Sequence, residues 1–223
     1  DAAERARAEL LRLRDEAFND LGDKLNERVG MEEIGRNRWL SQRFDAQKIS
    51  YPRTAPTRGF PEGQPSFTAG ATGWMHKHPH WLPKLIVRAD VLNNAAEKFV
   101  KGFILDYAHR GRLHASINQY RGEDGGARTS RFSYSDPALQ QIPIRDEVIG
   151  PMIRTCFVAE LGEAWLAADY SEQEYRLIVH FASLLGCRRA DEAAQRYRDD
   201  SAASFHQMVM DWTGLDRKSA KNT

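Results

Sequence analysis

Apolar residues recur along the first part of the chain at the spacing of one helix face. From residue 1 to about residue 28 the stripe is flanked by charges of both signs, which predicts a long amphipathic helix lying on a domain. A coiled-coil seam is the alternative, but the repeat is too short to secure it. The stripe consists of Ala3, Ala6, Leu10, Leu13, Ala17, Leu21 and Leu25.

A second long helix is predicted from Pro83, because proline is accepted in the first turn of a helix. Residues 29–45 predict one short helix. Residues 46–82 hold most of the prolines and show no periodicity, which predicts long loops. The buried face of the second helix would comprise Ile86, Ala89, Leu92, Ala96, Phe99 and Phe103.

Short apolar runs in the second half predict strands, so the chain is expected to be α+β. Alternating positions favour one strand within residues 111–119, and residues 153–158 and 165–168 predict a pair of strands around Gly162. The alternating apolar residues of the first strand are Leu113, Ala115 and Ile117.

The last of these strands would end at Asp169, and a helical pattern follows it. Ser171 and Glu174 match the S-x-x-E capping box that begins many helices. A carboxylate at the end of a buried strand can face a cleft and hold a hard cation such as Mg²⁺. The alternatives are that Asp169 only favours a turn and that Glu174 only caps the helix. The apolar face of this helix would be Tyr175, Ile178, Val179, Ala182 and Leu185.

The end of the chain predicts a short helix over residues 204–212 that carries His206. Asp216 then fits the N-cap of another helix, on which Arg217 and Lys221 are four residues apart and share one face. Two cations near a helix N-terminus suit a polyphosphate. A solvated basic face is the alternative.

Composition narrows the class of protein. The 223 residues are 41% hydrophobic and 28% charged with a net charge of +1, which is typical of soluble globular proteins. No apolar run is long enough to span a membrane and no secretory leader is present, so we expect a cytoplasmic protein. Cys156 and Cys187 are expected as reduced, buried thiols, although a disulfide stays open. Asp1 begins directly in a helical pattern and Thr223 follows an apparent helix start, which suggests part of a larger protein.

Local charge and histidine content give two further candidates. Residues 110–145 contain six arginines against three acids, a bias expected where phosphates are held, though a solvated loop is the alternative.

His76, His78 and His80 invite a metal interpretation. Pro79 breaks their register and no cysteine or acid flanks them, so we favour a loop without metal.

Three blocks, in order, resemble the family A DNA polymerases, the group typified by bacterial DNA polymerase I and some phage enzymes. Residues 129–143 (TSRFSYSDPALQQIP) resemble the family's T-G-R-L-S-S-x-x-P-N-L-Q-N-I-P segment. Residues 169–176 (DYSEQEYR) resemble motif A, D-Y-S-Q-I-E-L-R, and residues 217–221 (RKSAK) resemble the opening of motif B, R-x-x-x-K. The resemblance covers residues 111–223, whereas the first hundred residues match only loosely, as a helical thumb would.

The resemblance implies a right-hand fold made of three parts. Residues 1–108 would be a thumb-like helical region, residues 109–185 part of the palm, and residues 186–223 the start of the fingers. Asp169 and the carbonyl of Tyr170 would hold two catalytic Mg²⁺ ions in the complete enzyme. The residues implied for the incoming deoxynucleoside triphosphate are Glu174, His206, Arg217 and Lys221. Those implied for primer–template DNA are Arg128, Thr129, Arg131, Gln140, Asn93, Asn94 and Lys98.

The chain departs from the family pattern at several positions. Ser130 replaces the usual glycine, and Glu172 and Gln173 replace glutamine and isoleucine beside the metal. The insertion at residues 120–128 resembles phage members more than bacterial ones. The rest of motif B, the H-D-E segment with the second aspartate and the D-x-E exonuclease pattern are absent from the 223 residues.

The leading hypothesis is therefore a part of a DNA-directed DNA polymerase. The second is a binding module, a chain that only binds primer–template DNA, because one carboxylate cannot build a two-metal site. A third is another phosphoryl-transfer enzyme such as a nuclease. Any processivity or replisome partner is left open.

Overall fold

The computed structural model describes residues 1–67, 73–122, 126–129, 131–200, 202–216 and 219. The chain divides into two compact units, Asp1–Val158 and Ala159–Thr223. The expected α+β class is confirmed, with helices predominating over one small sheet. No helix in this described part of the chain is long and apolar enough to cross a membrane.

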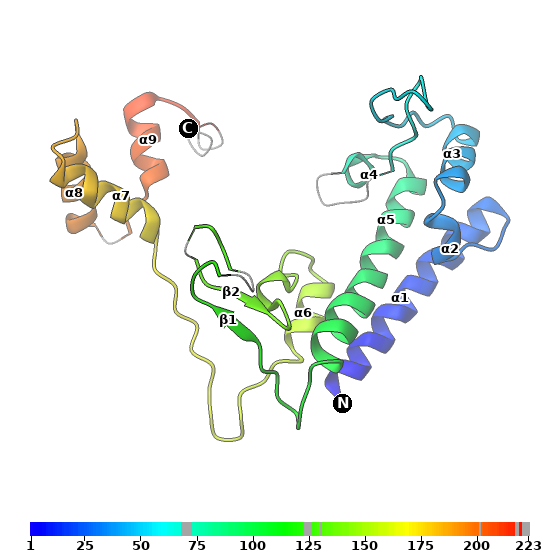
Figure 1. The fold of residues 1–223 in the computed structure, drawn as a ribbon, viewed down its shortest axis with the longest axis horizontal. Coiled ribbons are helices and arrows are strands. Elements are labelled where there is room, and N and C mark those ends of the chain that lie inside the picture. Colours follow the sequence, from blue (N-terminus) through cyan, green and yellow to red (C-terminus); the bar gives the residue numbers. More distant parts are fainter. Residues whose placement is uncertain (68–72, 123–125, 130, 201, 217–218, 220–223) are drawn as a thin grey trace. The chain divides into compact units, whose positions relative to one another are not determined.

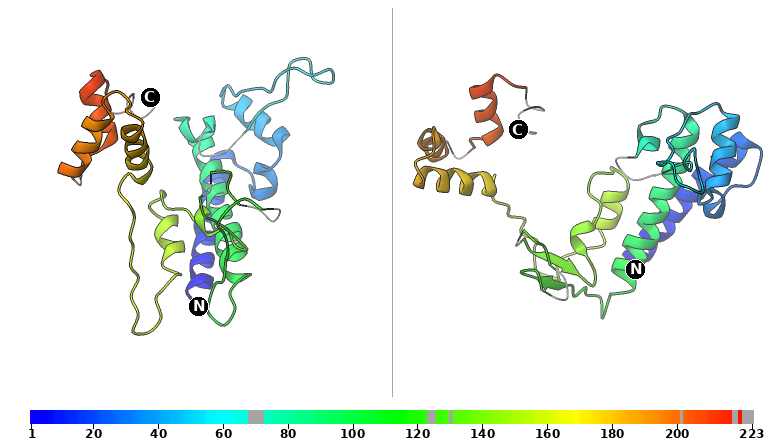
Figure 2. Two further views of the ribbon diagram at one scale, coloured as in Figure 1. Left: turned by 60° about the vertical axis from the view of Figure 1, so that its left-hand side comes forward. Right: turned by 45° about the horizontal axis from the view of Figure 1, so that its top comes forward.

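The first unit is built on two long helical segments that lie side by side in both figures (Figure 1, Figure 2). They are α1 (Ala2–Leu25) and α5 (Trp81–Asn94), which continues into η1 (Ala95–Leu105). Asp1 caps α1 in a capping box with Glu4. The apolar stripe of α1 packs against α5 and η1 in the same chain, so the expectation of a helix lying on a domain is confirmed.

Three short helices lie between α1 and α5 in the sequence. The segment expected to form one short helix contains two, α2 (Met31–Ile34) and α3 (Asn37–Ala46), and the expected loop region contains one turn, α4 (Trp74–Lys77). Helix α5 begins at Trp81, two residues before the predicted start. His80 determines this start, because its Nδ1 accepts a hydrogen bond from the Leu82 N–H at 3.2 Å.

The segment η1 is a π-helix, and its wider turn changes which residues are buried. The α-helical spacing predicted Phe99 and Phe103 in the core, but both are only half-buried. Val100 and Ile104 are buried instead. A π-helix bonds residues five apart, so positions after Ala95 move around the helix axis relative to α-helical spacing.

The small sheet pairs β1 (Ser116–Asn118) antiparallel with β2 (Ser133–Ser135), and Ile117 lies opposite Tyr134. The strand predicted within residues 111–119 is thus present but only three residues long. It is followed by η2 (Leu139–Gln141) and α6 (Ile149–Arg154).

The strand predicted at residues 153–158 is wrong, because α6 covers its beginning. The Asp146 carboxylate accepts from the N–H groups of Val148 and Ile149, each at 2.9 Å, and so stabilises the start of α6. Ile149 and Ile153, four residues apart, are both buried in the core shared with η1. Helical spacing therefore determines this segment rather than strand alternation.

The second unit contains α7 (Gln173–Leu184), α8 (Ala190–Asp199) and α9 (Phe205–Thr213). Its core is Val179, Ala193, Tyr197, Ala203 and Met208. The strand predicted at residues 165–168 is wrong, since Trp165 is 74% exposed and Leu166 89% exposed in an extended coil. A strand needs a neighbouring strand for its hydrogen bonds, and none pairs with this segment within the described residues.

The cysteine prediction also needs correction. Both cysteines are free, as expected of reduced thiols, but neither is buried, because Cys187 is exposed and Cys156 is half-buried. Burial raises the pKa of the Cys156 thiol above its ordinary value.

Candidate functional site

The extended coil that carries Asp169 and Tyr170 leads directly into α7. Both side chains are exposed, Tyr170 at 79%. An exposed carboxylate and a neighbouring backbone carbonyl are the oxygen ligands that Mg²⁺ prefers. The segment is therefore accessible for the role that the sequence suggested.

The capping box predicted at Ser171 and Glu174 is wrong. The N-cap is Glu172, with φ 51° and ψ 38° in the left-handed region, and its side chain makes no capping bond to α7. The helix begins at Gln173, so Glu174 is the second helical residue and not the third. The Arg176 Nε instead donates to the Ser171 carbonyl at 2.9 Å and so holds the turn before α7.

The Glu172 carboxylate accepts three hydrogen bonds from elsewhere in the second unit. The Tyr197 hydroxyl donates at 2.9 Å, the Ser204 hydroxyl at 2.7 Å and the Phe205 N–H at 2.6 Å. We call Glu172 with these three donors the Glu172 cluster. Phe205 is the first residue of α9, so the carboxylate of Glu172, which precedes α7, caps the N-terminus of α9.

Electrostatics in the Glu172 cluster favour the charged carboxylate. Burial works to raise the pKa of Glu172, but the bonds from Phe205, Ser204 and Tyr197 together hold it below its ordinary value. Burial, followed by the bond to Glu172, raises the pKa of the Tyr197 hydroxyl well above its ordinary value. The guanidinium of Arg176 lies 4.4 Å from the centre of the Tyr197 ring.

Aromatic contacts join α7 to α9 beside this cluster. The Tyr175 ring stacks on Phe205 with centroids 4.7 Å apart, and it meets the His206 ring edge-on at 5.2 Å. The Nδ1 atom of His206 is buried and has no hydrogen-bond partner among the described residues. His206 is thus held by ring packing and the helix on which it lies.

Of the four residues predicted to bind nucleotide, the structure describes two. Glu174 and His206 both belong to the second unit, on α7 and α9. Arg217 and Lys221 lie outside the described residues. The Asp216 carboxylate accepts from the Ser219 N–H at 2.8 Å, a bond that an N-cap would make, but most of the helix predicted after it lies outside the described residues.

The arginine-rich DNA candidates lie around the small sheet of the first unit. Arg128, Thr129 and Arg131 are exposed just before β2. Gln140 is fixed against that strand, because its Nε2 donates to the Tyr134 carbonyl at 3.1 Å and its Oε1 accepts from the Tyr134 N–H at 3.2 Å.

The helical DNA candidates divide into two kinds. Lys98 is exposed on η1, and its Nζ donates to Gln141 Oε1 at 3.3 Å, so η1 and η2 meet here. Asn94 is exposed as well. Asn93 instead uses its Oδ1 to accept from Arg14 at 2.9 Å, a contact between α5 and α1. Asn93 therefore contributes to helix packing in this structure.

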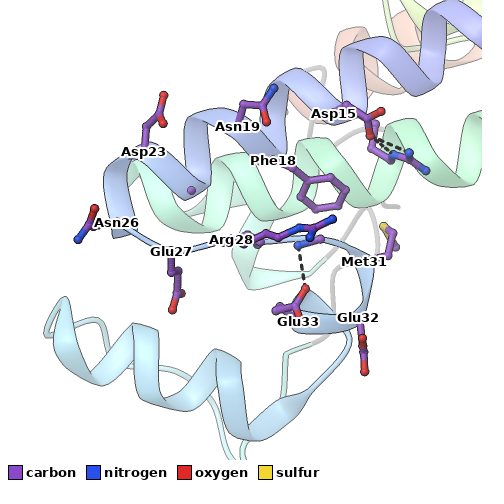
Figure 3. A pocket seen from close by; sticks show the side chains of 14 residues that line it. Asp15, Phe18, Asn19, Asp23, Asn26, Glu27, Arg28, Met31, Glu32 and Glu33 are labelled. Carbon is purple, nitrogen blue, oxygen red and sulfur yellow. Dashed lines mark hydrogen bonds and ion pairs between the residues drawn. The ribbon is translucent and has the colours of Figure 1, made fainter.

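A wide hollow of about 1340 Å³ lies between α1 and the segment that leads into α2 (Figure 3). None of the predicted site residues that the structure describes lines it. Two of its acidic side chains have partners, as Asp15 pairs with Arg14 and Glu33 accepts from the Gly30 N–H. The hollow is thus a groove between helices rather than part of the predicted site.

No cluster of three or more histidine, cysteine or acidic side chains suited to a metal occurs in the part of the chain that the structure describes. The histidines near α4 have local roles instead. His78 Nδ1 accepts from the His80 N–H at 3.2 Å, while His80 caps α5.

Sequence reasoning missed the role of Glu172. It noted only that glutamate replaces the family's glutamine at this position. This substitution was the one sequence feature that pointed to Glu172. It could not reveal the contacts of the carboxylate, because the donors come from α8 and from the start of α9.

Comparison with known proteins identifies the family of this chain. The family model described as DNA polymerase family A matches residues 19–222 of this chain. The DNA-directed DNA polymerase of Pseudomonas phage M6 is 38% identical over 156 residues, which cover 64% of this chain and 23% of that protein. DNA polymerase DpoZ of Acinetobacter phage SH-Ab 15497 is 34% identical over 62% of this chain and 22% of that protein.

Cellular relatives agree with the phage proteins. DNA polymerase I of Pseudomonas aeruginosa is 35% identical over 71% of this chain, and the match covers 17% of that protein. The fold resembles a structure described as the POL domain of Pol1 from M. smegmatis in complex with DNA primer-template and dNTP. That match has a TM-score of 0.57 and 21% identity, over 99% of this chain and 42% of that one. The chain spans about a fifth of the length of its sequence relatives, and it belongs to DNA polymerase family A.

Proposed function

We propose that this chain is part of a DNA-directed DNA polymerase that adds deoxynucleotides to a primer 3′ end on a DNA template. In this proposal residues 1–108 form the thumb, residues 109–185 part of the palm, and residues 186–223 the start of the fingers. The observation that carries the proposal is the family match, which runs through all three motif blocks in their family order.

The Asp169 carboxylate and the Tyr170 carbonyl would hold Mg²⁺. Both belong to an exposed segment, and both are oxygen donors, so the donor chemistry fits this hard cation. When bound, two such ions supply activation of the primer hydroxyl and stabilisation of the leaving pyrophosphate. The 223 residues contain no H-D-E segment, which carries the second aspartate in the family pattern, so we expect that carboxylate elsewhere in the complete enzyme.

Side chains of the second unit would hold the incoming deoxynucleoside triphosphate. His206 is fixed beside α7 by its contact with Tyr175. We assign it the triphosphate together with Arg217 and Lys221, because an imidazole N–H can donate to a phosphate oxygen and the arginine and lysine attract the phosphate charge. Glu174, exposed in the first turn of α7, would line the sugar pocket.

Primer–template DNA would contact the first unit. Arg128, Thr129 and Arg131 are exposed near β2 and can donate to backbone phosphates. Gln140 is already fixed by its two bonds to Tyr134, so it would present an ordered surface. Lys98 and Asn94 are accessible for the same role, whereas Asn93 would have to release Arg14.

Primer extension by the complete protein tests the proposal. Asp169→Asn should abolish incorporation in the presence of Mg²⁺ and deoxynucleotides, because it removes the charged metal ligand. Glu163→Gln, which neutralises an exposed acid in the same coil, is the matched control and should extend normally. Near-normal incorporation by Asp169→Asn would show that Asp169 is not a metal ligand.

A second candidate function is that the 223-residue chain by itself binds primer–template DNA without catalysis. It is favoured by the absence of an H-D-E segment from the 223 residues, because one carboxylate cannot build a two-metal site. The isolated chain should bind duplex DNA with an affinity that falls as salt rises. Any measurable nucleotide incorporation by the isolated chain would refute this alternative.

A further inference from the structure

We propose that Glu172 is a positioning residue that holds α9, and with it His206, against the helix that follows Asp169. This inference rests on the proposed function, because it concerns the placement of a group assigned to the incoming triphosphate. It also explains the glutamate that stands where the family pattern has glutamine.

The first argument is the number and origin of the donors. Tyr197 is the last buried residue of α8, Ser204 precedes α9 and Phe205 begins it. All three donate to one carboxylate at 2.6 to 2.9 Å. Bonds to a charged acceptor are stronger than bonds between neutral groups. A single side chain thus ties the start of α7 to both following helices.

The second argument is where α7 contacts α9, apart from the apolar core that Val179 and Met208 share. Close backbone approach in this unit is mainly between α7 and α8. Apart from the Glu172 cluster, Tyr175 provides the aromatic contacts with Phe205 and His206. Glu172 and Tyr175 are three residues apart, so α7 holds the first turn of α9 at two neighbouring points.

The third argument concerns the chemistry of the position. A carboxylate has two acceptor oxygens, and here one oxygen serves Ser204 while the other serves Tyr197 and Phe205. A glutamine has one acceptor oxygen and would lose one of these partners. A negative charge also suits the N-terminus of α9, where the helix dipole is positive.

The same geometry argues against Glu172 as an additional metal ligand. Its oxygens already accept three hydrogen bonds, and binding a cation would require some of those donors to leave. The structure therefore assigns Glu172 a structural role. Asp169, which is exposed, keeps the chemical role.

Formation of the ternary complex on a chain-terminated primer tests this inference without requiring catalysis. The complete protein is bound to a primer–template ending in a dideoxynucleotide, and the complementary deoxynucleotide is titrated. The variants are Glu172→Ala, Glu172→Gln and Ser204→Ala. Glu192→Gln is the matched control, because that acid is exposed in the first turn of α8, where it pairs with Arg189 before the helix.

Glu172→Ala should weaken deoxynucleotide binding about tenfold or more, as expected for loss of a charged acceptor that orders the site. Glu172→Gln should partly rescue binding, to within about threefold of the wild type, because its oxygen can still accept from Phe205. The control should bind as the wild type does. Primer–template affinity should be unchanged in every variant, since those contacts are assigned to the first unit.

Several results would overturn the inference. One is deoxynucleotide binding by Glu172→Ala within about twofold of the wild type. Another is a Mg²⁺ requirement that rises above that of the wild type by the same amount in Glu172→Gln and Glu172→Ala, which would identify Glu172 as a metal ligand. A parallel loss of primer–template affinity would mark general unfolding. If Glu172→Ala does not fold, Ser204→Ala decides, and wild-type deoxynucleotide binding by that variant refutes the role.

Failure of the inference can be distinguished from failure of the proposed function. If the wild-type protein forms no ternary complex, the polymerase proposal itself fails. If the wild type forms the complex and all Glu172 and Ser204 variants form it equally well, only the positioning role fails.

Discussion

Replacing Tyr197 with phenylalanine isolates one hydrogen bond of the Glu172 cluster. The hydroxyl donates to Glu172 Oε2 at 2.9 Å, and the tyrosine is 9% exposed. Phenylalanine keeps the ring in the core and under Arg176, so the change removes the hydroxyl without leaving a cavity for the ring.

The expected cost follows from the charge of the acceptor. A hydrogen bond to a charged group contributes about 1.5–3 kcal/mol. Glu172 would keep its bonds from Ser204 and Phe205, so its charge would not be left unsatisfied. We therefore expect Tyr197→Phe to lower the local unfolding free energy of the second unit by about 1–2 kcal/mol.

Hydrogen exchange followed by mass spectrometry measures this change directly. A loss of this size should speed exchange in peptides from α8 and α9 by about 5- to 30-fold, while peptides from α1 stay unchanged. Tyr107→Phe is the matched control, since that hydroxyl makes a long 3.4 Å contact with Asp136 in the exposed part of the first unit. It should alter stability by less than about 0.5 kcal/mol.

A double-mutant cycle then tests whether the loss belongs to this pair. Tyr197→Phe combined with Glu172→Gln should show a coupling energy of at least about 0.5 kcal/mol, as residues in contact do. An unchanged exchange rate in Tyr197→Phe, or strictly additive effects in the cycle, would refute the hydrogen bond as a source of stability.

Two further predictions concern the first unit. Leu92→Ala should lower the unfolding free energy by about 2–5 kcal/mol in chemical denaturation, because Leu92 is 1% exposed in the core that joins α5 to α1 and η1; a cost below about 1 kcal/mol would contradict this packing. Burial works to raise the pKa of Asp146, but the N–H groups of Ile149 and Val148 and the charge of Arg88 hold it below its ordinary value. The stabilisation from Asp146 is therefore complete above its unfolded pKa and lost as pH falls through the lower folded pKa. Asp146→Asn should cost about 1 kcal/mol at neutral pH, and the difference should shrink below about pH 4; a difference that persists at lower pH would contradict the assignment.

Local patterns predicted the helices well because helix formation depends on residues close in sequence. The apolar stripe of α1 was recognisable from the spacing of its residues, and the bond from the Ser219 N–H to the Asp216 carboxylate fits the residue type at that position. The same reasoning failed in η1, where Val100 and Ile104 replace the expected phenylalanines in the core. The prediction assumed α-helical spacing, because no simple sequence pattern distinguishes a π-helix from an α-helix.

Strand predictions failed where burial was assumed. The apolar residues at positions 165–168 matched a buried strand, yet Trp165 and Leu166 are exposed. The run at residues 153–158 belongs partly to α6, whose start is set by Asp146. A short apolar run fits a strand or a helix, and only its neighbours in space decide between them.

The sequence by itself determined the family, since the order and spacing of three motif blocks are properties of the chain, and the family match at residues 19–222 confirms it. It also marked Asp169 and His206 as candidates. Only the tertiary structure showed what Glu172 contacts, because Tyr197 lies 25 residues away and Phe205 lies 33 residues away. A carboxylate accepts from whichever donors folding brings near it, and that proximity depends on how α7, α8 and α9 pack together.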